Sequence, residues 1–238
     1  MGMSKVALVA ALEREVRPLV RRWDVKERDY GGRRFRFFER GDAVAICGGI
    51  GQEAARRASE AIIGLYTPEV IYSVGFAGAL EPRLNVGAVV RPVRVINAAD
   101  GSSVVLDQGD GVLLSFGSVA GAEQKSKLHA AFLAAAVDME AAAVARAAEM
   151  KSVRFGAIKV ISDEVGFEIP GMERFVDSQG KFLELRFAVF ASLRPWLWVR
   201  LWRLMGNSGR AARILCEQLD ALLERSAETY SQGAVTSR

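Results

Sequence analysis

Short apolar segments that suit buried strands alternate with helical segments along most of this chain. Residues 70–74 and 88–95 are rich in β-branched side chains, whereas residues 141–148 are rich in alanine. The first two segments favour strands and the third favours a helix. Because strands that alternate with helices form a sheet covered by helices, the pattern predicts an α/β fold. Half of the residues are hydrophobic, which suffices to cover such a sheet on both faces.

The length of 238 residues predicts one domain, and no internal repeat or linker divides it. Residues 52–66 form an amphipathic helical pattern, with apolar side chains at Ala54, Ala55, Ala58, Ile62, Ile63 and Leu65. The last helical pattern includes Leu215, Cys216 and Leu219 on one face and predicts ordinary core packing. We expect the domain to span residues 1–227. The Ser-, Gln- and Gly-containing segment 228–238 is predicted to be a disordered tail.

Two carboxylates occupy positions that favour ligand binding. Glu140 precedes the apolar run 141–145, so it stands at a helix N-terminus, where the helix dipole favours negative charge. Asp163 follows the apolar run 155–161, so it stands at the carboxyl end of a strand, where open α/β sheets bind small ligands. Each residue alone also fits a simpler role, as a dipole partner or as a turn or helix cap. Together they are suited to holding a sugar and protonating a leaving group.

Several separate stretches extend this signal along the chain. They are the strand and acidic turn at residues 6–16, the glycine turn at 47–51, the segments 75–80 and 84–90, and the motifs at 137–140 and 161–163. In this order they resemble the nucleoside phosphorylase/hydrolase superfamily, and within it the methylthioadenosine/S-adenosylhomocysteine nucleosidases. The resemblance implies a single-domain three-layer α/β/α fold with a central mixed, partly barrel-like sheet.

The resemblance also implies three catalytic residues. Glu15 matches the carboxylate that activates or positions the attacking water, and Glu140 matches the one that accepts hydrogen bonds from the sugar hydroxyls. Asp163 matches the acid that binds the purine and protonates N7 as the glycosidic bond breaks. These roles suit the chemistry, because positive charge builds on the sugar and negative charge on the base. Burial of Asp163 beside Val160 and Ile161 would favour its protonated form.

The substrate-binding residues that the resemblance implies are Phe76, Ala77, Gly78, Met139 and Ser162. Ala77 and Gly78 match a backbone turn that lines the sugar and the nucleophile, and Met139 matches the residue beneath the ribose. Phe76 departs from the pattern, since adenosine-type nucleosidases usually carry a small hydroxyl residue there. We expect its ring to narrow or reshape the site.

Two larger departures concern the 5′ side of the sugar. The nucleosidases have a long covering segment between the strand that ends near Asn97 and the strand at 111–116, and here it is short. The 5′ pocket is therefore expected to be more open. The C-terminal third instead resembles the hopanoid-associated phosphorylases, at residues 194–196 and at 206–208, which are expected to open the last helix. That similarity implies an adenosylated lipid as an alternative substrate.

The resemblance leaves three functions open. The first is hydrolysis of a 5′-substituted adenosine of the methylthioadenosine or adenosylhomocysteine type, with release of adenine. The second is phosphorolysis, in which phosphate replaces water. Glu15 opposes phosphate by charge repulsion, whereas Arg14, Arg56 and Arg57 are candidates to offset that repulsion. The third is a nucleoside-binding protein without activity, although such a protein would not need the three carboxylates.

No cofactor or metal is expected. Two cysteines and one histidine cannot supply a typical zinc site, and Cys47 and Cys216 do not suggest a disulfide framework. His129 lies in a helical stretch with Lys125 and Lys127 and is predicted to be a surface residue. A Ser-His-Asp or Cys-His mechanism is therefore not expected.

The net charge of +4 is unevenly distributed. Arginines alternate with phenylalanines at 33–38, a pattern that nucleic-acid binding could use but that a solvated edge strand explains better. Arginines also accompany Trp196, Trp198 and Trp202. That mixture suits a helix on an anionic membrane, but packing on the sheet or at a dimer interface is the preferred interpretation.

The partners expected are a small nucleoside, a second copy of the chain in a homodimer and, for the phosphorylase alternative, phosphate; no nucleic-acid partner is expected. The sequence shows no signal peptide and no apolar run of membrane-spanning length, so we expect a cytoplasmic protein.

Overall fold

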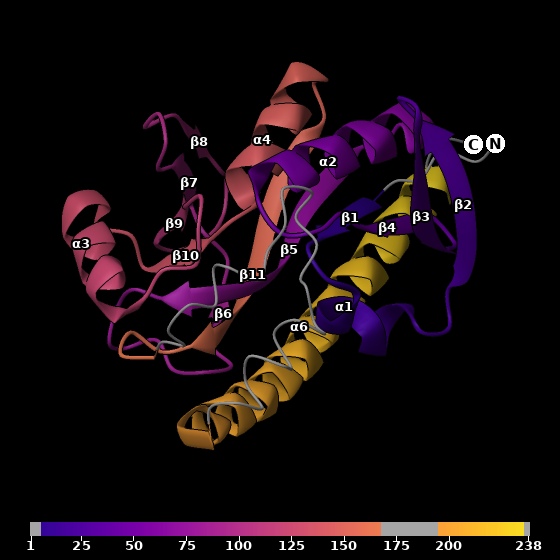
Figure 1. The fold of residues 1–238 in the computed structure, drawn as a ribbon. Coiled ribbons are helices and arrows are strands. Elements are labelled where there is room, and N and C mark those ends of the chain that lie inside the picture. Colours follow the sequence, from indigo (N-terminus) through magenta and orange to yellow (C-terminus); the bar gives the residue numbers. More distant parts are fainter. Residues whose placement is uncertain (1–5, 168–194, 236–238) are drawn as a thin grey trace.

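The computed structural model describes the backbone of residues 6–167 and 195–235, and the side chains of residues 6–167 and 206–228 (Figure 1). The strands are β1 (Val6–Ala10), β2 (Asp24–Tyr30), β3 (Arg33–Arg40), β4 (Ala43–Cys47), β5 (Val70–Ala79), β6 (Val89–Val90), β7 (Arg94–Asn97), β8 (Ser103–Val105), β9 (Val112–Ser115), β10 (Ala136–Asp138) and β11 (Arg154–Asp163). The helices are α1 (Glu13–Val20), α2 (Gln52–Tyr66), α3 (Ala122–Phe132), α4 (Ala141–Met150) and α6 (Pro195–Val235).

The strands form one mixed sheet that forks at β5. Along one path the order is β2-β3-β4-β1-β5-β10-β9-β7-β8, and β11 pairs with β5 and with the short β6. β1 pairs in parallel with β4 and with the first half of β5, while β10 pairs antiparallel with the end of β5. β11 runs parallel to β5 along its whole length. The carboxyl ends of β1, β4, β5 and β11 therefore point the same way, which favours a ligand site at that edge.

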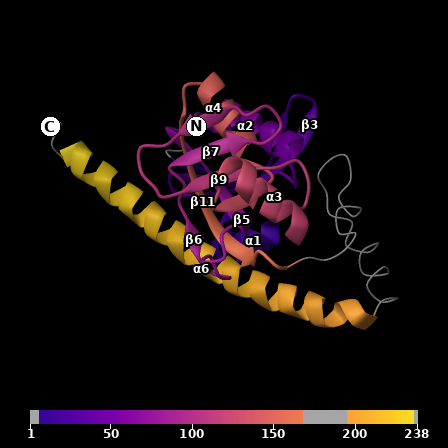
Figure 2. The same ribbon diagram turned by 90° about the vertical axis from the view of Figure 1, so that its left-hand side faces the viewer.

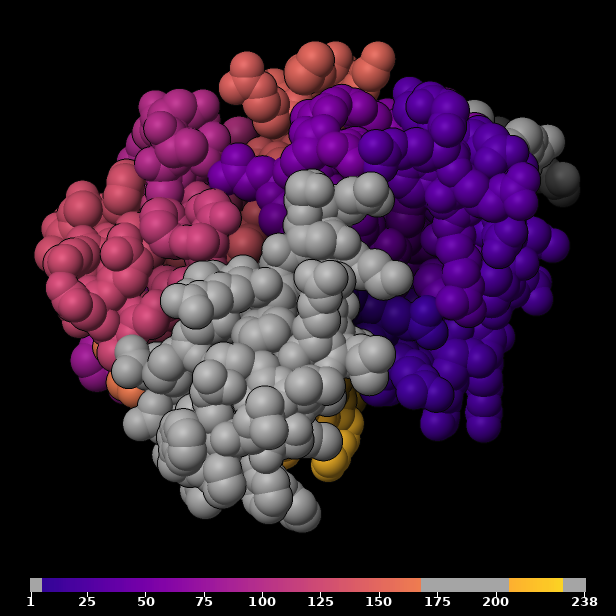
Figure 3. Space-filling model, viewed as in Figure 1, coloured from indigo at the N-terminus to yellow at the C-terminus, as the bar shows by residue number. Residues whose placement is uncertain are grey.

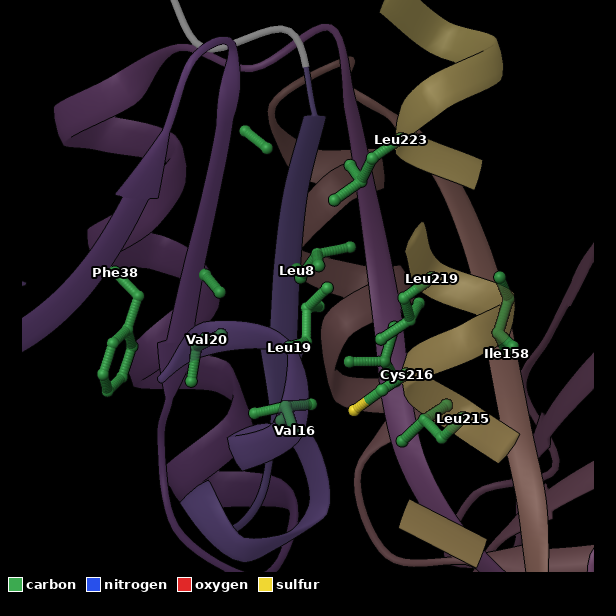
Figure 4. Close-up of a cluster of buried hydrophobic side chains, with 14 of the residues drawn as sticks. Leu8, Val16, Leu19, Val20, Phe38, Ile158, Leu215, Cys216, Leu219 and Leu223 are labelled. Atoms are coloured by element: carbon green, nitrogen blue, oxygen red, sulfur yellow. The ribbon is translucent and has the colours of Figure 1, made fainter. Parts of the chain in front are cut away.

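Helices cover both faces of this sheet (Figure 1). On one face, α2 and α4 pack against Ala7 and Val9 of β1. On the other face, Leu8 of β1 contacts the layer formed by α1 and α6. Figure 4 shows Leu215 and Leu219 of α6 turned toward the sheet and α1. The predicted three-layer α/β/α fold with a central mixed sheet is confirmed, as is the core packing of the last helix.

Two sequence-based predictions at the centre of the sheet need correction. The segment expected as one strand at residues 88–95 is divided into β6 and β7, with Pro92 between them. Proline lacks the N–H that a continuous ladder needs, so a break there is expected. Ala77 and Gly78, expected to form a turn, lie within β5, which continues to Ala79. Gly75 has φ +138, a conformation that favours glycine, but the strand continues through it.

The arginine- and phenylalanine-rich strand is also not the sheet edge that the sequence suggests. β3 pairs antiparallel with β2 on one side and with β4 on the other, so that β2 is the edge strand. Phe37 and Phe38 are both buried because they pack on opposite faces of the sheet. Their alternation with arginine is explained by this packing. The prediction that helix 52–66 is amphipathic is confirmed by α2.

The C-terminal helix is longer than the sequence predicts. Residues 206–208 lie inside α6, which begins at Pro195, so they do not open the last helix. α6 also continues past residue 227 to Val235, through helix-favouring residues 221–229, whereas a disordered tail was expected from residue 228. Figure 2 shows this helix running along the body of the molecule and beyond it.

The side chains of Trp196, Trp198 and Trp202 lie outside the described residues. Across the described helices, none combines the length and apolarity needed to cross a membrane.

Figure 3 shows the face of the molecule that lies between β2 and β3 on one side and α3 on the other. The carboxyl ends of β5 and β11 lie between these two sides (Figure 1), and Asp163 is the last residue of β11.

Candidate active site

A buried lysine in β11 organises the carboxylates at one part of the site. Nζ of Lys159 lies 2.9 Å from Oδ2 of Asp138, and both side chains are almost fully buried, at 1% and 0% exposed. Glu140 and Glu15 interact electrostatically with the same ammonium group. Burial alone would lower the pKa of Lys159, but these three carboxylates raise it above the ordinary value. The result is a buried group of three carboxyl side chains and one lysine.

Asp138 fixes the start of α4 within this group. Its Oδ1 accepts a hydrogen bond from Oγ of Ser115 at 2.6 Å, and its Oδ2 accepts the N–H of Ala141 at 2.9 Å. Together with the ion pair to Lys159, these bonds satisfy a carboxylate that water does not reach. Asp138 therefore holds the start of α4 in place, three residues before its hydrogen-bond partner Ala141 and two before the N-cap residue Glu140.

Glu140 is the N-cap residue of α4, as its sequence position predicts. Its Oε1 accepts the N–H of Gly51 at 2.8 Å, and its Oε2 accepts the N–H of Met139 at 3.2 Å. Burial, together with the charge of Asp138, raises the pKa of Glu140 from 4.5 to about 7, and Lys159 opposes this shift. Near neutral pH the side chain can therefore exist in both protonation states.

Glu15 comes from α1 but contacts the end region of β5. Its Oε2 accepts the N–H of Leu12 at 3.0 Å, and its Oε1 lies 3.4 Å from the N of Phe76. At Gly75, an added Cβ would come within 3.0 Å of Oε2 of Glu15, so the glycine allows this close approach. Burial raises the pKa of Glu15 above its ordinary value, while these N–H groups and Lys159 lower it. A buried carboxylate with a raised pKa is suited to accepting a proton.

Asp163 is the last residue of β11, as predicted, but its surroundings differ from the apolar setting that the sequence suggests. Nζ of Lys125 lies 2.5 Å from Oδ2 of Asp163, and Oγ of Ser162 donates to Oδ1 at 2.7 Å. The register of β11 against β5 shifts between Ile161 and Asp163, a bulge of the kind that redirects a side chain. Asp163 is thus held by an ammonium group and a hydroxyl, and its side chain stays 22% exposed.

The strand β11 links the two parts of the site. Lys159 and Asp163 are four positions apart, which corresponds to about 13 Å along a regular strand. The structure brings Glu15 and Glu140 together around Lys159, and Asp163 stands further along the same strand. One rigid element therefore sets the spacing between the group of three carboxylates and the separate aspartate.

The predicted substrate-binding residues line the same region. Ala77 is buried in β5, and an added Cβ at Gly78 would lie 2.9 Å from Oδ2 of Asp163. Met139, next to Glu140, is half-buried. The ring of Phe76 is half-buried and packs against the apolar cluster beneath α6, while its N–H faces Glu15.

Sequence reasoning missed Lys125, Lys159 and Asp138. Lys159 left a signal, since a charged residue within the apolar run 155–161 needs a buried partner. Lys125 left a weaker signal in the sequence, because the segment that forms α3 suggested a surface helix. His129, predicted at the surface, is half-buried, and its Nδ1 lies 2.9 Å from the carbonyl oxygen of Ala134.

Metal ligation has no candidate among residues 6–167 and 206–228, where no group of three His, Cys, Asp or Glu side chains is placed to hold an ion. Cys47 is half-buried and burial raises the pKa of its thiol, while Cys216 is buried in the core; both are free thiols.

A curated relative resembles part of this chain. The chain is 32% identical over 99 residues to the 5′-methylthioadenosine/S-adenosylhomocysteine nucleosidase of Marinomonas sp. (strain MWYL1). That match spans 40% of this chain and 42% of the relative, less than half the length of either.

Solved structures show the same fold over more of the chain. The nucleosidase of this type from Colwellia psychrerythraea, in complex with adenine, has a TM-score of 0.58 at 23% identity and covers 69% of this chain and 85% of its own. The nucleosidase from Campylobacter jejuni has a TM-score of 0.65 at 16% identity and covers 92% of this chain and 100% of its own.

The family assignment comes from a match over most of the sequence. The family model described as the phosphorylase superfamily matches residues 5–113 and 109–192, which include Glu15, Glu140 and Asp163. Because this match covers most of the sequence, the chain belongs to the phosphorylase superfamily.

Proposed function

We propose that this protein hydrolyses the N-glycosidic bond of a 5′-substituted adenosine and releases adenine. The observation that carries the proposal is the placement of Glu15 and Glu140 around Lys159, with Asp163 further along the same strand. Carboxylates at one end suit the cationic sugar of the transition state, and the aspartate at the other suits the purine. The relative from Marinomonas and the adenine complex from Colwellia support this substrate type.

Each carboxylate has a distinct role in the proposed reaction. Glu140 accepts hydrogen bonds from the ribose hydroxyls above Met139. Glu15, with its raised pKa, takes a proton from the attacking water. Asp163 and Ser162 bind the purine, while Ala77 and Gly78 of β5 form the wall between sugar and base. The negative charge near the sugar stabilises the oxocarbenium character of the transition state.

Water is a better nucleophile than phosphate for this charge distribution. Three carboxylates surround one lysine at the sugar end, which would repel a phosphate dianion. Arg56 and Arg57 of α2 both pair with Glu53, so they do not offset this repulsion. Arg14 interacts electrostatically with Glu15, but one further cation does not outweigh the three carboxylates. Hydrolysis therefore ranks above phosphorolysis.

A phosphorylase that acts on an adenosylated lipid is the second candidate. Its supporting observation is the short connection from β7 to β9, which holds only the small strand β8. A short cover on that side leaves space for a large 5′ substituent. The chain is expected to work as a cytoplasmic homodimer in either case. A binding protein without activity is the third candidate, and it predicts no turnover of any nucleoside.

The test is to incubate the purified protein with methylthioadenosine and with adenosylhomocysteine, each with and without phosphate, and to measure adenine and the sugar product. Adenine and free sugar without phosphate are the expected result. Adenine that forms only with phosphate, together with a sugar 1-phosphate, would identify a phosphorylase. If neither substrate reacts, an adenosylated lipid is the next substrate, and inactivity on that too would favour a binding protein.

A further inference from the structure

Lys125 is a buried lysine for which the proposed reaction has no role. It lies in α3 and is only 1% exposed, although lysine is almost never fully buried unless it is paired. Its Nζ donates to Oδ2 of Asp163 at 2.5 Å and to the carbonyl oxygen of Glu164 at 2.7 Å. The helix thus delivers a proton-bearing group to the residue that is proposed to bind the purine.

Two hydrogen bonds reach the carboxyl oxygens of Asp163, and Asp163 is the acceptor in each. Oδ2 accepts from Lys125, and Oδ1 accepts from the hydroxyl of Ser162 at 2.7 Å. An ammonium group can only donate, so the proton in the bond between Lys125 and Asp163 comes from the lysine. A proton that leaves the Asp163 side chain can therefore be replaced from a donor that already contacts it. The two donors in contact with Asp163 are the Lys125 ammonium, which carries three N–H donors, and the Ser162 hydroxyl, which carries one O–H.

The surrounding structure makes room for this pair. An added Cβ at Gly78 would lie 2.9 Å from Oδ2 of Asp163 and 3.3 Å from Nζ of Lys125, so β5 contributes only backbone at this point. The other charges on the same helix are directed elsewhere, since Lys127 pairs with Glu123 in solvent at 2.6 Å. The Asp163 side chain keeps an exposed fraction of 22%, whereas Lys125 is shielded behind it. A ligand would therefore meet Asp163 first and Lys125 only through it.

We infer that Lys125 supplies the proton that the purine takes up as it leaves, and that Asp163 relays it. The inference rests on the proposed function. When the bond between C1′ and N9 breaks, its electron pair goes to the purine. A proton passes from Nζ of Lys125 to the Asp163 carboxylate, and the carboxyl group gives a proton to N7. Water adds to C1′ and loses a proton to Glu15. Neutral purine and free sugar leave, Lys125 regains a proton from solvent and Glu15 returns its own.

Lys125 in this scheme is a positioning residue that acts through Asp163, and its effect depends on the leaving group. A purine needs a proton to depart, whereas 4-nitrophenolate departs as a stable anion without one. The two substrates to compare are methylthioadenosine and the 4-nitrophenyl glycoside of the same 5-methylthioribose. Both present the same sugar to Glu15 and Glu140, so a defect in the sugar site would affect them equally.

The variants are Lys125→Met, Lys125→Arg and the control Lys127→Met, which removes an exposed lysine from the same helix. For Lys125→Met we expect kcat on methylthioadenosine to fall about 100-fold or more, and kcat on the nitrophenyl glycoside to change less than about threefold. Lys125→Arg keeps the charge and N–H donors, but arginine does not release its proton in proteins. It is therefore expected to show the same selective loss, while Lys127→Met leaves both rates unchanged.

Three results would overturn the inference. Equal losses on both substrates in Lys125→Met would assign the lysine a structural role. Full activity in Lys125→Arg would show that the positive charge suffices and that no proton is transferred. Unchanged rates in Lys125→Met would remove Lys125 from the reaction. Where Lys125→Met does not fold, as judged by circular dichroism, the Lys125→Arg result decides alone. A wild-type protein that cleaves neither substrate would instead contradict the proposed function, and the inference would fall with it.

Discussion

Oε1 of Glu140 accepts the backbone N–H of Gly51 at 2.8 Å, and this bond joins the N-termini of α4 and α2. The two residues are 89 positions apart in the sequence. Gly51 has φ +93, a conformation that favours glycine, so the glycine turn presents its N–H toward the carboxylate. The bond fixes one oxygen of Glu140 before any substrate arrives. A preorganised acceptor of this kind does not have to be reoriented during the reaction.

The raised pKa of Glu140 predicts a pH-dependent effect of Glu140→Gln on stability. The folded-state pKa is about 7 against an ordinary value of 4.5, so wild-type stability falls as pH rises through this interval. Glutamine does not ionise and escapes that loss. The free energy of unfolding of the variant, relative to wild type, is expected to increase by about 2 to 3 kcal/mol between pH 5 and pH 8. Urea unfolding at both pH values measures it, and a difference independent of pH would contradict the shift.

Asp163→Asn is expected to abolish most turnover of purine nucleosides while the fold remains intact. Asparagine can still accept a hydrogen bond from Lys125 through its side-chain oxygen, but it cannot relay a proton. We expect kcat to fall by about 100-fold or more on methylthioadenosine. Adenine release measures the rate, and circular dichroism checks the fold. Asp29→Asn, at an exposed carboxylate of β2, is the control and should retain wild-type activity. Full activity in Asp163→Asn would remove the residue from the catalytic set.

Gly78→Ala is expected to displace the Lys125–Asp163 pair. The new methyl group would lie 2.9 Å from Oδ2 of Asp163 and 3.2 Å from Cε of Lys125, closer than ordinary van der Waals contact. We expect a decrease in kcat of about tenfold or more, since small displacements of reacting groups reduce rates strongly. Gly209→Ala in α6 has nothing within 4 Å and should leave kcat unchanged. Equal activity in both variants would show that Gly78 does not shape the site.

Lys159→Met is expected to destabilise the protein severely. It leaves the carboxylate of Asp138 buried, with a side-chain exposure of 0%, and without its ion-pair partner. Breaking a buried pair in this way costs about 3 to 5 kcal/mol. The double variant Lys159→Met/Asp138→Asn removes both charges and should recover part of that loss. Denaturant unfolding of the two single variants and the double variant gives the coupling energy, and purely additive losses would contradict a direct interaction.

The sequence predicts the positions of individual site residues well where the signal is local. The apolar run 155–161 identifies the strand whose end carries Asp163, and the alanine-rich segment identifies the helix that Glu140 caps. The helix at 52–66 follows from its apolar spacing and agrees with α2. These features depend on contacts within one element, whose periodicity is visible in the order of residues.

The sequence is less informative where pairing between strands decides the outcome. Ala77 and Gly78 were expected to form a turn, but β11 pairs with β5 at both residues, and β10 pairs with the end of β5 from Gly78, so this segment stays extended. The charged strand β3 suggested a sheet edge, but β2 covers it. Local composition does not show which strand lies beside another, so it cannot distinguish an edge from an interior position.

The sequence by itself determined the α/β/α layering, the helix start at Glu140 and the strand end at Asp163. Only the tertiary structure decided which charges meet: Lys159 with Asp138 across 21 positions and Lys125 with Asp163 across 38. The physical reason lies in the range of the interactions. Hydrophobic periodicity reports which side of each element is buried, whereas the cost of burying a charge is offset only by a partner from another element. That partner becomes identifiable once the sheet has brought the two elements together.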